Sequence, residues 1–392
     1  MPWLRVWYDT CMAFFFRQPK RSHIAIDLGS HAIKAAIFEK PVEGMVPDNI
    51  RKLVKKLNVT SRGSQSCAGL SDLLSGLLKQ QKRAPEKIII GIGPNNAHIT
   101  LHEWTVDSAH AREMLTPSHI QKYFQDLFNE HREETHASLG YPIAVEINGY
   151  PVNIHSLASY DPSSVREITL RTIMLEFEDK AGLIFGELKQ MFSGIEIELI
   201  PLPAATAEVL GITCHINDGI LIDVGGSSTE VMFMHNAHLL QLSSFPVGSD
   251  RFSHRIVKTT GGKFVEAEDL TRQYSHGLIS KDEQMELSHI FSEEAIKWKK
   301  EFINALEAYY PIAPIPEDFY LYGGGSYLPE VRSALWSRDI VKKFSAFESP
   351  RVHIIQAPQI FNNDSLIPHI RGPEDVGLAS LMYYSLHHKP LF

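Results

Sequence analysis

The chain has 392 residues, which at about 150 residues per domain predicts two or three domains. Hydrophobic residues make up 44% of it and charged residues 21%, a balance that excludes a disordered or fibrous chain. The net charge of −8 argues against the broad basic surface that attracts nucleic acid. Three cysteines, none of them in a CxxC pair, argue against a disulfide framework and a zinc site and fit a reducing compartment.

The N-terminal segment, residues 1–21, is rich in aromatic and apolar side chains. As a helix, its apolar run Trp3–Phe16 would span about 21 Å, short of the roughly 30 Å hydrocarbon core of a membrane. It also lacks the basic region and cleavage site of a secretory signal. Two interpretations stay open. The helix lies in the membrane interface, with Arg17, Lys20 and Arg21 on anionic lipid, or it packs on the protein or a partner.

Beyond residue 21, strand-like and helix-like stretches alternate. His23–Phe38 predicts a strand, a glycine turn and a second strand, and the leucine spacing over Leu70–Leu78 predicts an amphipathic helix. The apolar run Lys87–Ile92 predicts a buried strand. Residues 105–178 differ in character, because a charged helix (Ser118–Glu134) precedes several extended segments, and we interpret them as an α+β insertion. The extended segments are Ile143–Ile147, Tyr150–His155 and Glu167–Leu175.

The second half of the chain contains a unit that looks like a duplicate of His23–Phe38. This unit, Gly219–Met234, again predicts a strand, a glycine turn and a second strand. A long helix is expected within Asp282–Tyr309, and the strand Phe319–Tyr322 leads into three glycines. Further helices are expected at Phe177–Phe192, Ala204–Leu210 and Pro329–Trp336.

Both duplicated units end their first strand in an aspartate that is followed by glycine and hydroxyl residues. Glycines allow a turn that presents backbone N–H groups to an anion, and the aspartate can hold Mg²⁺ through water. The residues are Asp27, Gly29, Ser30 and Lys34 in the first loop and Asp223, Gly225, Gly226 and Ser227 in the second. Two such loops facing each other would form a clamp suited to a triphosphate.

A third glycine-rich turn, Gly323-Gly324-Gly325, follows the strand that ends at Tyr322. Alone, it predicts only a tight turn. After the two aspartate loops, and in this order, it predicts a nucleotide site, because a glycine backbone can approach a flat base or a phosphate closely.

The ordered set of loops resembles the actin-like ATPase superfamily, which includes sugar kinases and Hsp70 chaperones, and within it the bacterial FtsA/PilM group. The insertion at 105–178 is similar to the extra subdomain of that group. Pro246–Phe252 (PVGSDRF) is similar to the segment after its second phosphate loop, and Phe264–Asp269 (FVEAED) to its adenosine-side motif. The resemblance covers residues 22–385.

This resemblance implies that the chain binds ATP and Mg²⁺. Asp27 and Asp223 would hold Mg²⁺, through water, and Asp223 is the candidate catalytic residue. The backbone of both loops would cradle the phosphates, Lys34 would add charge, and Glu268 and Gly323–Gly325 would line the adenosine. The full set is Asp27, Gly29, Ser30, Lys34, Asp223, Gly225, Gly226, Ser227, Glu268, Gly323, Gly324 and Gly325.

Four positions depart from the family pattern. His31 stands where small residues are commoner, and Asp269 and Thr271 stand where the family tends to place lysines. Leu202 replaces an acidic residue. Without a polar side chain at position 202, no obvious group orients an attacking water molecule, so we expect slow ATP hydrolysis or none.

The implied fold is α/β, with two actin-like (ribonuclease H-like) lobes of related topology, an inserted α+β subdomain and the nucleotide between the lobes. The expected parts are a membrane-anchor candidate (1–21), lobe I (22–104 and 179–214), the insertion (105–178), lobe II (215–250 and 318–372), a helical subdomain of lobe II (251–317) and a C-terminal helix returning to lobe I (373–392).

For function, the resemblance favours an ATP-binding scaffold, peripheral at the cytoplasmic face of the cell membrane. An FtsA-like chain would tether the tubulin-like division polymer to the membrane surface through residues 1–21. The alternative is a PilM-like protein that binds the cytoplasmic tail of a bitopic pilus protein among the pilus inner-membrane proteins. A sugar-kinase-like enzyme and a chain that has lost nucleotide binding are less favoured. Self-association is among the expected interactions, and nucleic acid binding is not.

Overall fold

The computed structural model describes residues 22–41, 46–56, 64–79, 84–135, 139–177, 186, 190, 192, 194–344, 350–362 and 370–388. The anchor candidate, residues 1–21, lies outside the described residues, as does most of the helix predicted at Phe177–Phe192. The described part is built on three β-sheets. Within it, no helix combines the length and the apolar character needed to cross a membrane.

Lobe I is built on a five-stranded sheet of order β3-β2-β1-β4-β9, in which β1 is antiparallel to β2 and parallel to β4. Its strands are β1 (Ser22–Leu28), β2 (Ala32–Glu39), β3 (Asp48–Lys56), β4 (Lys87–Ile92) and β9 (Glu196–Pro201). The helices α2 (Ser64–Lys79), α6 (Leu202–Thr213) and α12 (Val376–His387) share its core. Residues on both faces of β1 and β4 are buried, which explains why these strands are continuous apolar runs.

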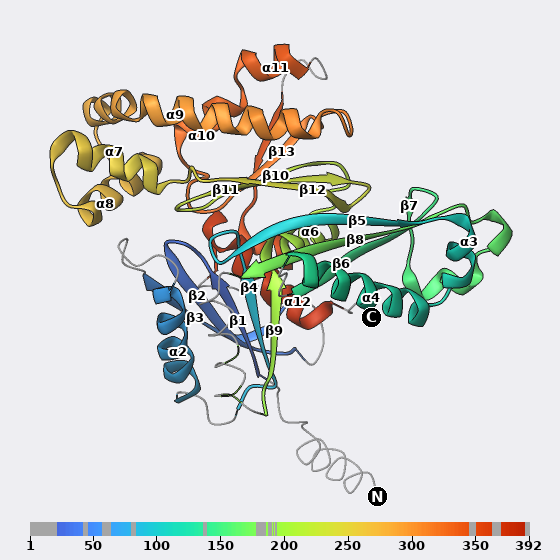
Figure 1. The fold of residues 1–392 in the computed structure, drawn as a ribbon. Helices are drawn as coiled ribbons and strands as arrows, with labels where there is room; N and C mark the ends of the chain where they lie inside the picture. The colour runs from blue at the N-terminus through green and yellow to red at the C-terminus, as the bar shows by residue number, and fades with distance from the viewer. Residues whose placement is uncertain are drawn as a thin grey trace, which may run out of the picture.

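Lobe II repeats this topology in a sheet of order β12-β11-β10-β13-β14, where β10 is antiparallel to β11 and parallel to β13. Its strands are β10 (Gly219–Val224), β11 (Thr229–His235), β12 (His238–Phe245), β13 (Asp318–Tyr322) and β14 (Arg351–Ile354). In Figure 1 this sheet lies above that of lobe I. The matching strand orders confirm the expected pair of related lobes.

Five helices belong to lobe II: α7 (Asp250–Thr260), α8 (Phe264–Ser275), α9 (Lys281–Tyr309), α10 (Pro329–Leu335) and α11 (Arg338–Phe344). The long helix α9 begins with a capping box between Ser280 and Glu283 and lies across the sheet in Figure 1. Its buried Trp298 donates a hydrogen bond to Thr229 Oγ1 at 2.9 Å, at the start of β11. This bond fixes α9 to the end of the second loop.

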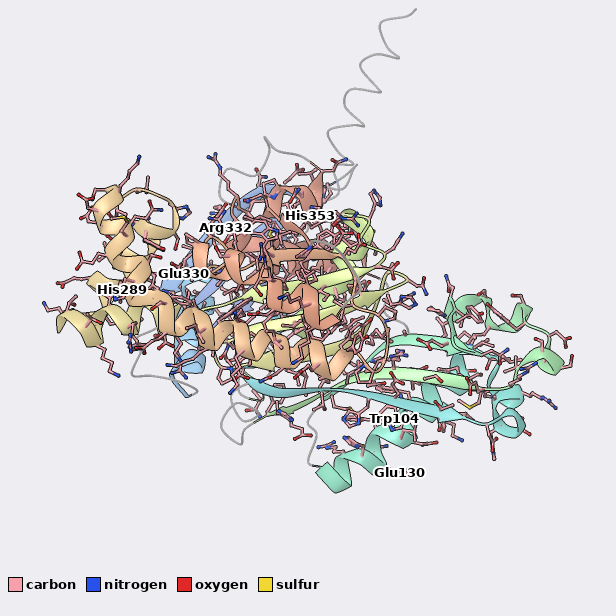
Figure 2. The ribbon with its side chains drawn as sticks, turned by 90° about the horizontal axis from the view of Figure 1, so that it is seen from above. Trp104, Glu130, His289, Glu330, Arg332 and His353 are labelled. Atoms are coloured by element: carbon pink, nitrogen blue, oxygen red, sulfur yellow. The ribbon has the colours of Figure 1, made fainter. Side chains whose placement is uncertain are left out.

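The insertion forms a four-stranded sheet of order β5-β8-β6-β7 with its own core. Its strands are β5 (Ala97–Val106), β6 (Leu139–Ile147), β7 (Tyr150–Pro151) and β8 (Ile168–Phe177), and its helices are α3 (Ser108–Ala111), η1 (Arg112–Met114), α4 (Pro117–Thr135), η2 (Ile154–Ser159) and η3 (Pro162–Ser164). Figure 2 shows it projecting from the two lobes, with Trp104 of β5 and Glu130 of α4 on the projection.

Two expectations for the insertion need correction. Its sheet begins at Ala97 and not at Thr105, because all of β5 pairs with β8 and not with the sheet of lobe I. The extended segment predicted at Tyr150–His155 is mostly absent, since β7 ends at Pro151 and the 3-10 helix η2 begins at Ile154. The other predicted domain limits stay predictions. The remaining 3-10 helices are η4 (Ala357–Phe361) and η5 (Pro373–Asp375).

Candidate nucleotide site between the two lobes

A cavity of about 380 Å³ lies between the two lobes, where β1 and β10 end. Asp27 near the end of β1 and Asp223 near the end of β10 both line it. The other walls come from the two loops, the start of α7, helix α8 and the turn after β13. Because β1 and β10 hold equivalent places in two similar sheets, their carboxyl ends bring the two predicted loops to one cavity.

The two loops are hydrogen-bonded to each other across the cavity. The backbone N–H of Ser227 donates to Ser30 Oγ at 3.0 Å. Asn95, in the β4–β5 loop, donates to Ser228 Oγ at 3.2 Å and accepts a hydrogen bond from the Ser227 hydroxyl. Lobe I therefore holds the second loop at its hydroxyl residues.

The second loop also holds the start of α7. The backbone N–H groups of Ser249 and Asp250 donate to the carbonyl oxygens of Gly225 and Gly226 at 2.9 and 2.8 Å. A β-carbon on Gly248 would lie 2.3 Å from the Gly226 oxygen, so a side chain there would separate α7 from the loop. This contact explains the glycine in the Pro246–Phe252 segment.

A group of acids lies at the ends of the central strands. Burial raises the pKa of Asp223 to about 7; the charge of Asp27 adds to the rise, and the charge of Lys34 opposes it. Glu230 of β11 lies directly opposite Asp223 in the antiparallel register. Burial, together with the charges of Asp223 and Asp27, raises the pKa of Glu230 well above its ordinary value. Two buried acids therefore face each other here, and a nearby cation opposes the rise in the pKa of Asp223.

Lys34 is that cation. Its Nζ lies 3.4 Å from Asp27 Oδ2 and donates to the backbone oxygen of Glu374. Burial alone would lower the pKa of Lys34, but the charges of Asp27, Asp375 and Asp223 outweigh burial and raise it. Lys34 is thus positively charged and lines the cavity, as the sequence predicts for a phosphate-neutralising group.

Glu268 of α8 lines the cavity but is held by side chains of lobe I. Its Oε1 lies 3.0 Å from His31 Nε2 and 2.8 Å from Lys56 Nζ. His31 Nδ1 also lies 3.4 Å from Asp250 Oδ1. The hydrogen bond to Asp250 raises the pKa of His31 most; burial opposes this rise, and the charges of Asp250 and Glu268 reinforce it. These contacts join the two lobes at the side of the cavity where the adenosine is expected.

The three glycines after β13 differ in their placement. Gly323 and Gly324 line the cavity, and the backbone N–H of Gly323 donates to the Pro373 oxygen at 3.0 Å. Gly325 packs on Val224 outside the cavity lining, where a β-carbon would lie 2.4 Å from Val224 Cγ1. Ser227 also lies outside the lining, so its hydroxyl contributes by positioning the loop. The other predicted residues line the cavity.

The structure shows what surrounds the positions that depart from the family pattern. Leu202, the first residue of α6, lines the cavity and is nearly buried. Thr271 donates to the Ala267 oxygen at 2.8 Å, and the exposed Asp269 pairs with Arg272 one turn away. The side chain of Leu202 has no polar atom that could orient water.

Sequence reasoning missed Glu230, the ion pair between Lys52 and Asp375, and Asn95. The Lys52 Nζ lies 2.5 Å from Asp375 Oδ1 and joins β3 to the residues before α12. A signal existed for Glu230, because an aspartate and a glutamate that flank a tight glycine loop face each other in an antiparallel pair. For Lys52 and Asn95 the sequence offered no such signal.

The residues fit a nucleotide with Mg²⁺. Among the described residues, no group of three or more histidine, cysteine, aspartate or glutamate side chains is arranged to hold a metal ion. Two aspartates suit Mg²⁺, which keeps several waters and takes its other ligands from phosphate. Gly324 leaves open space, since a β-carbon there would meet no atom within 4 Å. Asp27 and Asp223 would hold the ion, and Lys34 would neutralise part of the phosphate charge.

Comparison with known proteins agrees with this geometry. Residues 220–366 match the family model described as "Cell division protein FtsA". The cell division protein FtsA of Bacillus subtilis (strain 168) is 27% identical over 202 residues, which is 45% of this chain and 44% of that protein. The match thus spans less than half the length of this relative.

A solved structure extends the likeness to the whole fold. A structure described as the PilM-PilN type IV pilus biogenesis complex superimposes with a TM-score of 0.64 at 13% identity, over 94% of this chain and 100% of that chain. The ethanolamine utilization protein EutJ of Carboxydothermus hydrogenoformans reaches a TM-score of 0.48 at 15% identity, over 94% and 91% of the two chains. The family model and the FtsA relative show that this chain is similar to FtsA, and the PilM-PilN structure shows that it shares the actin-like fold.

Proposed function

We propose that the chain binds ATP with Mg²⁺ between its lobes, and that the nucleotide sets the closure of a scaffold for other proteins. The observation that supports this most is the pair of aspartates, Asp27 and Asp223, which end equivalent strands of two lobes and line one cavity. Lys34 beside them supplies positive charge, and the turn at Gly323 and Gly324 leaves backbone open to a ligand. Hydrolysis is slow, because Leu202 offers no polar atom to water.

Replacing Asp223 tests the site. Asp223→Ala should lower Mg-ATP affinity roughly tenfold or more, since it removes a charge directed at the metal. Isothermal titration calorimetry on the full chain measures the affinity. The matched control is Asp218→Ala, because Asp218 precedes the same strand but is half exposed and pairs with His235 outside the cavity. Unchanged affinity in Asp223→Ala would refute the site assignment.

The proposed role is FtsA-like, at the cytoplasmic face of the membrane, where the chain tethers a tubulin-like division polymer. The match of residues 220–366 to the FtsA family model supports this choice. A PilM-like role in type IV pilus assembly is the second candidate, because the likeness to the PilM-PilN structure extends over 94% of the chain.

Two binding partners separate these roles. With Mg-ATP, an FtsA-like chain should co-sediment with the tubulin-like polymer of its host. It should not bind a peptide from the cytoplasmic tail of a bitopic pilus protein. Binding of the peptide, without binding of the polymer, would assign the chain to pilus assembly.

A further inference from the structure

Glu230 is a buried acid in the cavity wall that ATP binding leaves unused. Its carboxyl lines the cavity, and the residue is only 8% exposed. Within the described part of the chain, its side-chain carboxyl takes part in no hydrogen bond or ion pair, although its backbone is paired in the sheet. Its oxygens face the cavity and not a protein partner, so their place beside Asp223 points to a ligand received there.

Most of the other acidic side chains of the cavity form ion pairs. Asp27 pairs with Lys34, Asp250 with His31, Glu268 with His31 and Lys56, and Asp375 with Lys52. Asp223 is the proposed metal-side acid, and Glu374 is exposed. Glu230 is therefore the remaining buried acceptor in the cavity.

Glu230 of lobe II faces Gly93 of lobe I across the cavity. A β-carbon on Gly93 would lie 3.7 Å from Glu230 Oε1, and Gly93 itself lines the cavity at the end of β4. The carboxyl thus faces a gap between the two lobes, bordered by Asp223 on its own sheet and by Gly93 on the other. Both the Glu230 carboxyl and the two loops line this cavity, so a water molecule and a phosphate could be held in the same space.

We propose that Glu230 holds the water molecule that attacks the terminal phosphate of the bound nucleotide, the role for which Leu202 has no polar atom. This inference rests on the proposed ATP site. Glu230 accepts a hydrogen bond from the water, whose oxygen forms the new bond to phosphorus as the bond from phosphorus to the bridging oxygen breaks. The bridging oxygen leaves with its electron pair on the nucleoside diphosphate, and both water protons stay on the released phosphate.

Two variants and a control test this role. Glu230→Ala removes the acceptor, and Glu230→Gln keeps an acceptor oxygen at the same place. The control is Glu294→Gln on α9, because Glu294 is 6% exposed and lies outside the cavity lining. Phosphate release from Mg-ATP is measured in single turnover with excess full-length protein, Mg-ATP affinity by calorimetry, and folding by thermal unfolding.

We expect Glu230→Ala to release phosphate about 100-fold more slowly than the wild type, the effect of losing a positioned group of this kind. Its Mg-ATP affinity should stay within about threefold, because the proposed contact of Glu230 is with the water molecule and not with the nucleotide. Glu230→Gln should release phosphate faster than Glu230→Ala. Glu294→Gln should release phosphate at the wild-type rate. After desalting, the nucleotide that remains bound should be ATP in Glu230→Ala and ADP in the wild type.

Three results would count against the proposals, and they can be told apart. Wild-type phosphate release by a folded Glu230→Ala overturns the role of Glu230. So does a wild-type chain that binds Mg-ATP and never releases phosphate, and both leave the binding site standing. Failure of the wild type to bind Mg-ATP refutes the proposed function itself. If Glu230→Ala does not fold, Glu230→Leu, which also removes the acceptor, is compared with Glu294→Gln, and equal rates overturn the role.

Discussion

At Gly323 the backbone itself forms part of the cavity wall. Its φ of +87° lies in the region that side chains avoid, and a β-carbon there would lie 2.1 Å from Asp223 Oδ1 and 2.6 Å from the Val224 oxygen. A β-carbon on the next residue, Gly324, would meet nothing within 4 Å. Adjacent glycines thus serve different ends: the first packs the turn against the metal-side aspartate, and the second leaves space for a ligand.

An alanine substitution at each of the two glycines tests these two roles separately. Gly323→Ala should lower the free energy of unfolding by about 1–3 kcal/mol, because it combines a strained φ with a clash against backbone, and it should weaken Mg-ATP binding by displacing Asp223. Gly324→Ala should keep wild-type stability. Thermal unfolding and calorimetry measure both. Equal stability of the two variants would show that the turn relaxes without cost.

Between elements, His31 and Lys56 of lobe I join α7 and α8 of lobe II across the cavity. The sequence assigned Glu268 to the adenosine, yet in the structure this acid is bound to His31 and Lys56. Both contacts use Oε1, so a nucleotide that uses this oxygen of Glu268 must replace them. Because the raised pKa of His31 comes mainly from Asp250, with the Glu268 charge adding to it, the contact is strongest while the imidazole is protonated.

The sign of the resulting pH dependence follows from this shift. A group whose pKa is raised by folding stabilises the folded state fully below its unfolded pKa, about 6.5 for histidine, and loses that contribution as pH rises through the folded pKa. The melting temperature of the wild type should therefore exceed that of His31→Gln at pH 6, and the difference should shrink toward pH 8.5.

The matched control for this titration is His289→Gln. His289 lies on the exposed surface of α9 and is labelled in Figure 2. The difference between this variant and the wild type should stay constant over the same pH range. A constant difference for His31→Gln as well would show that the imidazole does not contribute through its charge.

At the scale of the whole molecule, two similar lobes close around one cavity while the insertion projects from them (Figures 1 and 2). The insertion has its own sheet and its own hydrophobic core. The insertion also contacts both lobes, since Ala97, Ile173 and Leu175 lie in the core of lobe I and Arg171 of β8 donates to the Leu240 oxygen of β12 at 3.3 Å. A change in the angle between the lobes can therefore reach the insertion through these contacts.

The N-terminal segment belongs to this scale, since it would join the whole scaffold to a membrane. Deleting Met1–Phe16 should leave a folded protein that no longer sediments with vesicles containing anionic phosphatidylserine, because the aromatic side chains that enter the interface are gone. Neutral phosphatidylcholine vesicles serve as the control for charge. Equal sedimentation of the truncated chain would refute the anchor, and loss of its thermal transition would instead show that the segment packs on the protein.

The elements that carry a local signal were predictable. The apolar run Lys87–Ile92 is a buried strand, and the leucine spacing over Leu70–Leu78 is a helix whose Leu70, Leu74 and Leu77 are buried. Periodicity and turn chemistry act over a few residues, so they can be read without the fold. The same signal could not show that β5 belongs to the insertion, because strand partners are chosen by long-range pairing.

The sequence by itself determined the two aspartate loops, the third glycine turn and their order, since glycine turns after apolar strands depend on neighbouring residues. Only the tertiary structure decided what surrounds them. The antiparallel register places Glu230 opposite Asp223, and closure of the lobes brings His31 to Glu268, 237 residues away. Packing on Val224 turns Gly325 away from the cavity. These contacts follow from register and from the approach of the two lobes, which no local pattern encodes.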